Sequence, residues 1–203
     1  MVTRTDIINK LFESFGFKTY LEIGVRVPGE NFDLIHAELK ESVDPEPMGE
    51  CTYITTSDDF FENHAGNKKY DVICVDGLHT AEQVYVDVIN SIKHLNDDGV
   101  IVMHDCNPLL EYHIRSYEDY LKTRGHWNGT VFRGFIQLKK ELKDWNCFVI
   151  NEDNGCGIIT QRVLKRQFPA LQSYAEPIVW DYFAEYRERL LDLITYSEYL
   201  GIL

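Results

Sequence analysis

Long apolar runs are missing from this sequence, and their absence argues against a membrane-spanning helix. No uninterrupted apolar segment approaches the roughly 20 residues that such a helix needs. The first residues, Met1 to Lys10, also lack the apolar stretch that follows the basic residue of a secretory signal. We therefore expect a cytoplasmic protein that does not bind membranes.

Basic side chains are scarce. The chain of 203 residues has 20 Lys and Arg against 33 Asp and Glu, which gives a formal charge of −13. Such a charge repels a phosphate backbone over most of the surface, so we expect that nucleic acid is not a substrate. The length and an apolar share of 44% predict a single folded domain over residues 1–203.

Cysteine pairs are also missing. The five cysteines are scattered, odd in number and without a C-x-x-C spacing, and Cys74 and Cys147 lie inside strand-like runs. This pattern favours a reduced compartment and excludes both a disulfide framework and a structural zinc site.

Strand-like runs alternate with helix-like segments over the first half of the chain. A first helix over residues 5–16, capped by Thr5 or Asp6, precedes five expected strands. Helices are expected over residues 30–40, after a Ser57 cap, and from the Thr80–Gln83 capping pattern to about residue 95. The strands are expected at Tyr20–Val25, Glu41–Asp44, Tyr53–Thr56, Tyr70–Val75 and Val100–Met103. This order predicts an α/β protein with a doubly wound, mostly parallel sheet and helices on both faces.

The second half has a less regular pattern. Helical stretches near residues 111–122 and from 130 to about 143 precede two strands, Cys147–Ile150 and Gly157–Thr160, joined by a hairpin-type turn. These two strands predict an antiparallel edge of the sheet. The segment Trp180–Leu200 has aromatic and aliphatic residues at helical spacing, so we expect a helix that packs on the sheet. A homo-oligomer formed through this helix is the alternative.

Two motifs follow neighbouring strands directly. Asp76-Gly-Leu-His79 comes after Val72–Val75, and His104-Asp-Cys-Asn-Pro108 comes after Val100–Met103. The ends of adjacent parallel strands lie about 5 Å apart, and open α/β sheets bind ligands beyond these ends. Asp76 and Asp105 are therefore placed to share a divalent cation. Each aspartate alone is explained by a loop or a helix cap, but together with His79 they predict an active site.

The motifs after the first four strands resemble those of class I S-adenosylmethionine-dependent methyltransferases. The resemblance rests on Glu22-Ile-Gly24, on Asp44, on Ser57-Asp58 and on Asp76. The sequences D-G-L-H-T and H-D-C-N-P are similar to those of a bacterial subgroup allied to macrolide-sugar O-methyltransferases. The likeness covers about residues 5–160, and it implies a Rossmann-like, seven-stranded sheet whose last strand is antiparallel.

The resemblance also assigns the cofactor, S-adenosylmethionine, to the half of the chain over residues 19–106. It implies that the turn with Glu22, Gly24 and Gly29 binds the methionine part and that Asp44 binds the ribose hydroxyls. It places Ser57 and Asp58 near the adenine and Asp76 beside the cofactor. For Ser57, a helix cap is an equally good explanation.

Acceptor residues are expected from the two motifs and from residues 107–203. Methyl transfer to an alcohol needs alignment and removal of a proton, and the resemblance implies His79 as the base. Asp76 and Asp105 are expected to bind Mg²⁺ and so orient a sugar-like diol. The remaining residues expected to border the substrate are His104, Asn107, Trp127 and Asn128.

Some positions differ from the family pattern and keep other functions open. Arg26 and Pro28 interrupt the glycine-rich turn, Cys106 stands where relatives often have an oxygen ligand, and Thr130 replaces a commonly acidic residue. These differences allow a cofactor-binding module without catalysis. A metal-dependent hydroxylase with His79, His104 and Asp105 as its ligands is a further alternative.

Overall fold

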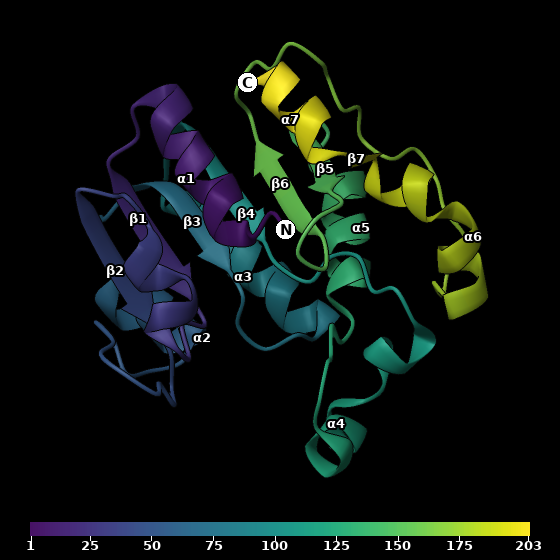
Figure 1. Cartoon of the computed structure of the whole chain (residues 1–203), viewed down its shortest axis with the longest axis horizontal. Helices are drawn as coiled ribbons and strands as arrows, with labels where there is room; N and C mark the ends of the chain where they lie inside the picture. Colours follow the sequence, from purple (N-terminus) through teal and green to yellow (C-terminus); the bar gives the residue numbers. More distant parts are fainter.

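A seven-stranded sheet forms the centre of the computed structural model, which covers residues 1–203 (Figure 1). The strand order is β2-β1-β3-β4-β6-β5-β7. Neighbouring strands from β2 to β4 are parallel, β6 is antiparallel to both β4 and β5, and β7 is parallel to β5. The strands are β1 (Thr19–Ile23), β2 (Leu39–Val43), β3 (Tyr70–Val75), β4 (Leu95–Met103), β5 (Asn146–Ile150), β6 (Cys156–Thr160) and β7 (Leu193–Ile194). The predicted Rossmann-like, mostly parallel α/β sheet is thereby confirmed.

Helices connect the strands and cover both faces of the sheet. The α-helices are α1 (Arg4–Phe15), α2 (Ser57–Asp59), α3 (Ala81–Lys93), α4 (Tyr117–Thr123), α5 (Val131–Glu141), α6 (Trp180–Leu191) and α7 (Tyr196–Ile202). The shorter helical turns are η1 (Pro28–Glu30), η2 (Phe32–Leu34), η3 (Phe60–His64) and η4 (Glu111–Ile114). None of these helices is long and apolar enough to cross a membrane.

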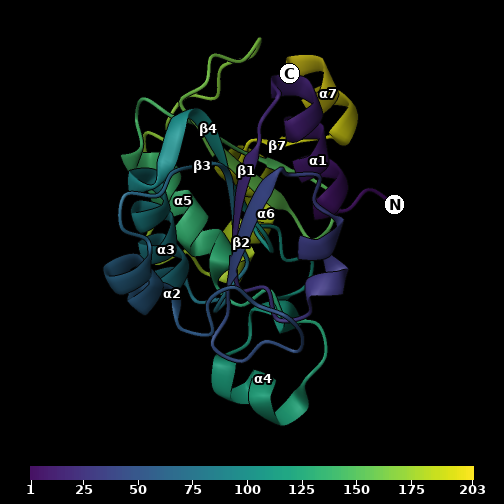
Figure 2. The same cartoon turned by 90° about the vertical axis from the view of Figure 1, so that its left-hand side faces the viewer.

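Two apolar cores lie on the two sides of the sheet. Alternate side chains of a strand point to opposite faces, so Ile73 packs in one core and Cys74 in the other. The first core joins the sheet to α3, α5 and α6, and the second joins it to α1 and α7. Figure 2 shows the sheet between these layers and α4 projecting from the body of the protein.

The first helix begins earlier than the sequence pattern suggested. Its cap is Thr3, whose hydroxyl accepts the N–H of Asp6 while the Asp6 carboxylate accepts the N–H of Thr3. Asp6 is therefore the third residue of a capping box rather than the cap. Gly16, with φ 66°, ends the helix in the left-handed conformation as expected.

A buried hydrogen-bond network prevents the helix that was expected over residues 30–40. The Asn31 amide donates to Glu22 Oε2 (2.9 Å) and to Tyr20 Oη (3.1 Å), and Tyr20 Oη donates to Glu22 Oε2 (2.7 Å). Asn31 has φ −147°, which lies outside the helical range. The helix prediction was wrong because this side chain draws the backbone away, leaving only the short turns η1 and η2.

The strand expected over Tyr53–Thr56 is reduced to a single bridge between Tyr53 and Val43. Thr55 donates its hydroxyl hydrogen to Asp59, and Thr56 accepts the N–H of Asp59 as the cap of α2. Both threonines therefore serve the start of the helix, and the chain leaves the sheet. The predicted cap at Ser57 was wrong by one residue for the same reason.

The carboxyl-terminal segment is not the single helix that was predicted. Asp192 ends α6 in the left-handed conformation, with φ 44°, and its carboxylate pairs with Lys139. Lys139 is only 1% exposed, and a buried ammonium group needs a charged or hydrogen-bonding partner. The short strand β7 and the helix α7 follow this break, and α7 packs in the second core.

Glu22 gives a prediction on the stability of the fold. Burial raises its pKa from 4.5 to about 7 despite its hydrogen bonds with Tyr20 and Asn31. The unfolded chain loses this proton near pH 4.5, but the folded chain keeps it until about pH 7. The contribution of Glu22 to the free energy of unfolding is therefore lost as the pH rises across this range, by up to about 3 kcal/mol.

We expect Glu22→Gln to be more stable than the wild type at pH 8 and similar to it at pH 4.5, as measured by urea unfolding. Glu13→Gln, at an exposed position of α1, is the control, and equal pH profiles for Glu22→Gln and the wild type would contradict this account.

Candidate functional site

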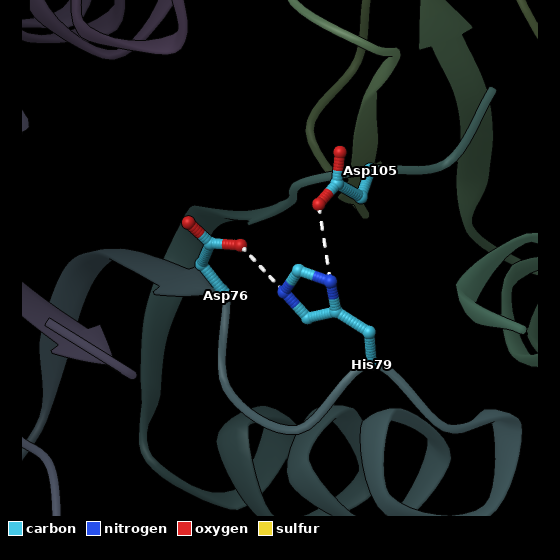
Figure 3. A group of neighbouring side chains, drawn as sticks. All are labelled: Asp76, His79 and Asp105. Atoms are coloured by element: carbon cyan, nitrogen blue, oxygen red, sulfur yellow. Dashed lines mark ion pairs between the residues drawn. The ribbon is translucent and has the colours of Figure 1, made fainter. Parts of the chain in front are cut away.

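Asp76, His79 and Asp105 lie together at the carboxyl ends of β3 and β4 (Figure 3). Asp76 directly follows β3, Asp105 lies two residues beyond β4, and His79 lies in the turn before α3. His79 Nε2 is 3.3 Å from Asp76 Oδ1, and His79 Nδ1 is 3.1 Å from Asp105 Oδ2. The imidazole thus stands between two carboxylates that come from neighbouring strands.

Two glycines allow the backbone to approach this group closely. At Gly24, with φ 86°, a Cβ would lie 2.2 Å from the carbonyl oxygen of Asp76, and at Gly129, with φ 61°, a Cβ would lie 1.9 Å from that of His79. Only glycine fits such positions. Asp105 also has a left-handed backbone, with φ 60°, so the chain turns sharply where its carboxylate is presented.

The loop from Trp127 to Thr130 holds His79 and Asp105 in place. The side-chain amide of Asn128 donates to Asp105 Oδ1 (2.9 Å), and the N–H of Thr130 donates to the carbonyl oxygen of His79 (2.9 Å). Asn128 is 1% exposed, so its hydrogen bond to Asp105 is shielded from water. This loop therefore sets the distance between the histidine and the carboxylate.

The neighbours of His79 determine which nitrogen carries its hydrogen. Nδ1 lies 3.1 Å from both the carbonyl oxygen of Trp127 and Asp105 Oδ2. Nε2 also faces an acceptor, Asp76 Oδ1 at 3.3 Å, so the three oxygens together favour the imidazolium. In the neutral imidazole we assign the hydrogen to Nδ1, which has two acceptors, and the lone pair to Nε2. Nε2 is therefore the nitrogen that can take up a proton, and Asp76 Oδ1 lies beside it.

Trp127 orients the imidazole through its ring. The ring centroids of Trp127 and His79 are 5.4 Å apart, and the angle between the ring planes is 14°. For Trp127 and Tyr120 the centroid distance is 4.6 Å and the interplanar angle is 11°. Trp127 Nε1 donates to the carbonyl oxygen of Arg115 (2.8 Å). Because both the ring and the N–H of Trp127 have partners within the protein, Trp127 supports the orientation of His79. Its expected contact with a substrate stays a prediction.

His104 supplies a second positive charge behind the carboxylates. Its Nδ1 lies 3.2 Å from Asp76 Oδ1, and its Nε2 lies 3.5 Å from Asp153 Oδ2. Burial alone would lower the pKa of His104, but the charges of Asp76 and Asp105 raise it to about 10. The two nitrogens face Asp76 and Asp153 and do not converge with His79 on one point, an arrangement that does not favour the two-histidine iron site of a hydroxylase.

The two carboxylates and the two histidines shift one another's pKa values. Burial alone would raise the pKa of Asp76, but the charge of His104 and hydrogen bonds with His104 and His79 lower it, so Asp76 is ionised. For Asp105, burial raises the pKa and the two histidines only partly oppose this. Burial would lower the pKa of His79, and the hydrogen bond with Asp76 and the charge of Asp105 raise it. These carboxylates therefore stabilise a protonated His79.

Two residues that the sequence reasoning missed complete the charge balance. Arg4 Nη2 lies 3.6 Å from Asp76 Oδ2, and Arg4 Nη1 lies 3.7 Å from Asp153 Oδ2. Arg4 is the first residue of α1, and Asp153 lies in the turn between β5 and β6. Neither position has a local sequence signal for this role, because both reach the site only through the packing of distant segments.

The residues expected to bind the cofactor line the same edge of the sheet. Glu22 is buried at the end of β1. Asp44, at the end of β2, is 8% exposed and accepts the N–H groups of Arg26 (2.8 Å) and Glu46 (2.7 Å), so it also orders its own loop. A carboxylate has further lone pairs for a ribose. A Cβ added at Gly29 would meet nothing within 4 Å, so close approach does not require glycine there.

Ser57 and Asp58 lie near the amino end of α3. The Gln83 amide lies 3.3 Å from Ser57 Oγ and 3.2 Å from Asp58 Oδ1. This contact joins the start of α2 to α3 and leaves Asp58 exposed. Binding of adenine by these residues stays a prediction.

Asn107 and Cys106 point to other neighbours. Asn107 donates to Asn151 Oδ1 (2.9 Å) and accepts from Arg187 (3.3 Å). Cys106 is fully buried, its thiol donates to the carbonyl oxygen of Met103 (3.4 Å), and burial raises its pKa. Cys106 is therefore part of the core, which explains why a thiol can stand next to Asp105 without joining the carboxylate group.

A sequence model of a methyltransferase-domain family matches residues 21–106. The match begins in β1 and includes Glu22, Gly24, Asp44, Asp76 and His79, and it ends directly after Asp105. A search among curated proteins gives no match.

Several solved methyltransferase structures share the fold. An O-methyltransferase from Bacillus cereus in complex with S-adenosylhomocysteine is 13% identical, with 78% of this chain and 80% of that chain covered and a TM-score of 0.52. An S-adenosylhomocysteine-bound methyltransferase from Podospora anserina is 16% identical, with 80% of each chain covered and a TM-score of 0.54. A sugar N-methyltransferase from Streptoalloteichus is 11% identical, with 80% of this chain and 88% of that chain covered and a TM-score of 0.54. The family model thus covers less than half of the chain, and the solved structures show that the chain shares their α/β fold.

Proposed function

We propose that this protein transfers a methyl group from S-adenosylmethionine to a hydroxyl oxygen of a small, polyhydroxylated, sugar-like acceptor. The observation that carries the proposal is the position of His79, which stands between Asp76 and Asp105 at the edge of the matched segment and whose Nε2 has the lone pair in the neutral imidazole assigned above. The presence of S-adenosylhomocysteine in two structures with the same fold supports the cofactor.

The turn after β1 and the ends of the following strands would hold the cofactor. Gly24 lets this turn approach the backbone of Asp76, and Glu22, Asp44, Ser57 and Asp58 lie along the same edge. When bound, S-adenosylmethionine supplies a methyl group on a positively charged sulfur. Acidic side chains near this position favour a cationic ligand, and Asp76 is ionised beside it.

His79 would remove the proton of the acceptor hydroxyl. The proton goes to Nε2 as the oxygen forms its bond to the methyl carbon, and the electron pair of the carbon–sulfur bond stays on sulfur. Asp105 accepts the Nδ1 hydrogen of His79 and stabilises the imidazolium, while Asp76 Oδ1 faces the newly protonated Nε2. This is the orienting role that a carboxylate has towards a catalytic histidine in hydrolases.

The polar character of the site favours a polyhydroxylated acceptor. An acceptor next to His79 meets carboxylate and imidazole groups, which hydrogen-bond hydroxyls well. The neighbouring aromatic ring of Trp127 is stacked with His79 and Tyr120. A base is more important for an alcohol than for an amine, because an alcohol is a poor nucleophile until it loses its proton, so oxygen is favoured over nitrogen as the methylated atom.

The carboxylates also fit a divalent cation. One ligand atom each of Asp76, His79 and Asp105 lie within 4.8 Å of one another, and carboxylate oxygens are ligands that Mg²⁺ prefers. We propose that Asp76 and Asp105 hold Mg²⁺, with the remaining positions taken by water and acceptor oxygens. The cation would lower the pKa of a bound hydroxyl and so assist its deprotonation.

The roles of cofactor and base are tested by combining binding and turnover. We expect calorimetry to detect binding of S-adenosylhomocysteine to the wild type and to His79→Gln with similar affinity. We expect release of S-adenosylhomocysteine during turnover, assayed over a panel of sugars and glycosides, to fall about 100- to 10,000-fold in His79→Gln because a general base is lost. His36→Gln, at an exposed position, is the control for turnover.

Two outcomes would contradict this assignment in different ways. If the wild type does not bind S-adenosylhomocysteine, the methyltransferase proposal fails. If the wild type binds it but methylates no acceptor of the panel, and substitution of His79 changes no property of the complex, the chain is a cofactor-binding module without catalysis.

The metal is tested separately. We expect EDTA to lower turnover roughly 100-fold and Mg²⁺ to restore it, because the cation stabilises the developing negative charge on oxygen. Asp76→Asn and Asp105→Asn should lose this response to Mg²⁺, and also the Mg²⁺-induced rise of the melting temperature. Asp97→Asn, at an exposed position, should retain both. Full activity in EDTA would leave a mechanism in which His79 and its two carboxylates act alone.

A further inference from the structure

Arg4 is a positively charged side chain without a well-formed partner beside the proposed cofactor site. Its side chain is 19% exposed and forms ion pairs with Asp76 and Asp153 at 3.6 and 3.7 Å. Charge-assisted hydrogen bonds of this type are normally about 2.7–2.9 Å long. The Nε of Arg4 is buried and has no hydrogen-bond partner. The guanidinium is thus held near carboxylates, but its donors are poorly used.

Hydrogen bonds of the Arg4 backbone and of the next residue, rather than of the Arg4 side chain, fix the position of Arg4. The Asp153 carboxylate accepts the backbone N–H of Arg4 (2.8 Å), and the hydroxyl of the next residue, Thr5, donates to Asn31 Oδ1 (2.7 Å). Asn31 in turn donates to Glu22. The first turn of α1 is therefore attached to both the turn between β5 and β6 and the segment after β1, and any side chain at position 4 is presented at this edge.

Arg4 lies between two parts of the site that the cofactor would touch. Asp76, which it pairs with, follows β3, and the carbonyl oxygen of Asp76 lies against Gly24 in the turn after β1. Glu22 lies at the start of the same turn, close enough to raise the pKa of Arg4 together with Asp76 and Asp153, although burial alone would lower it. A ligand that follows the turn past Gly24 to Asp76 therefore passes the guanidinium.

The chemistry of the amino-acid end of S-adenosylmethionine suits this arrangement. That end carries an ammonium group and a carboxylate on one carbon atom. Asp76, which is ionised, is an acceptor suited to the ammonium group, whereas a carboxylate needs donors. The planar fork of an arginine binds a carboxylate through two parallel hydrogen bonds, and Arg4 is a cation that the structure places beside Asp76.

We propose that Arg4 binds the carboxylate of the methionine part of S-adenosylmethionine, an inference that rests on the proposed methyltransferase function. The zwitterionic end of the cofactor then replaces the long ion pair between Arg4 and Asp76 by two closer ones. Arg4 pairs with the cofactor carboxylate, and Asp76 Oδ2, the oxygen that now faces Arg4, pairs with the cofactor ammonium group. Asp76 Oδ1, on the side of His79, stays available for the roles proposed above. The number of charges of each sign stays balanced, and the unpaired donors of the guanidinium gain an acceptor.

The proposal is tested with two ligands that differ only in this carboxylate. S-Adenosylmethionine and its decarboxylated form both keep the adenosine, the sulfonium and the ammonium group. We expect Arg4→Gln to weaken binding of S-adenosylmethionine roughly 10- to 100-fold in calorimetry, and to leave the affinity for the decarboxylated ligand unchanged. Arg4→Lys keeps the charge but loses the fork, so we expect an intermediate loss for S-adenosylmethionine alone. Lys10→Gln, on the same helix and paired only with Glu13, should bind both ligands like the wild type.

The outcomes separate this proposal from the one on which it rests. Unchanged affinity of Arg4→Gln for S-adenosylmethionine would overturn the role of Arg4 and leave the proposed function intact. An equal loss for both ligands would show that Arg4 only supports the fold, and it would overturn the proposal as well. Failure of the wild type to bind either ligand would overturn the proposed function itself. Melting temperatures of all variants identify any that do not fold, and Arg4→Lys provides the comparison if Arg4→Gln is one of them.

Discussion

The structure depends on the compensation of two largely shielded carboxylates by the basic side chains around them. Asp76 and Asp105 lie at neighbouring strand ends, where their negative charges would repel one another at low dielectric. His79 and His104 each lie within ion-pair distance of both carboxylates. Arg4 adds a permanent positive charge from α1. The amino-terminal helix, the turn before α3 and the strand ends are therefore held together by charge as well as by apolar packing.

Much of the sheet and the centre of the site could be predicted from the sequence. The strands β3 and β4 are uninterrupted apolar runs, and each is followed directly by an aspartate, so their parallel pairing was sufficient to bring Asp76 and Asp105 together. His79 follows Asp76 by only three residues, and its position required no long-range information. Arg4 and Asp153 could not be predicted in the same way, because each reaches the site from a segment whose path depends on the packing of the whole chain. Asn128 was expected near the site only through the family resemblance, and its contact with Asp105 was not predicted.

The errors in the predicted elements have a common physical origin. At Asn31, Thr56 and Asp192, a polar side chain makes a hydrogen bond or an ion pair that ends or prevents a regular element. Periodicity describes which face of an element is apolar, and it contains no information on such single contacts. For Asn31 and Asp192 the partners, Glu22 and Lys139, are buried, so a small number of polar contacts decides the course of long stretches of backbone.

The close fit of Gly129 against His79 limits how this protein can change. A single methyl group at position 129 would overlap the carbonyl oxygen of His79, so the loop that holds this histidine tolerates almost no substitution at its centre. The segment before it contains α4, which projects from the body of the protein (Figure 1). This segment exposes apolar residues such as Leu110, Tyr117 and Leu121. Sequence change would therefore accumulate in this outer segment, while the spacing between His79 and its carboxylates stays constant.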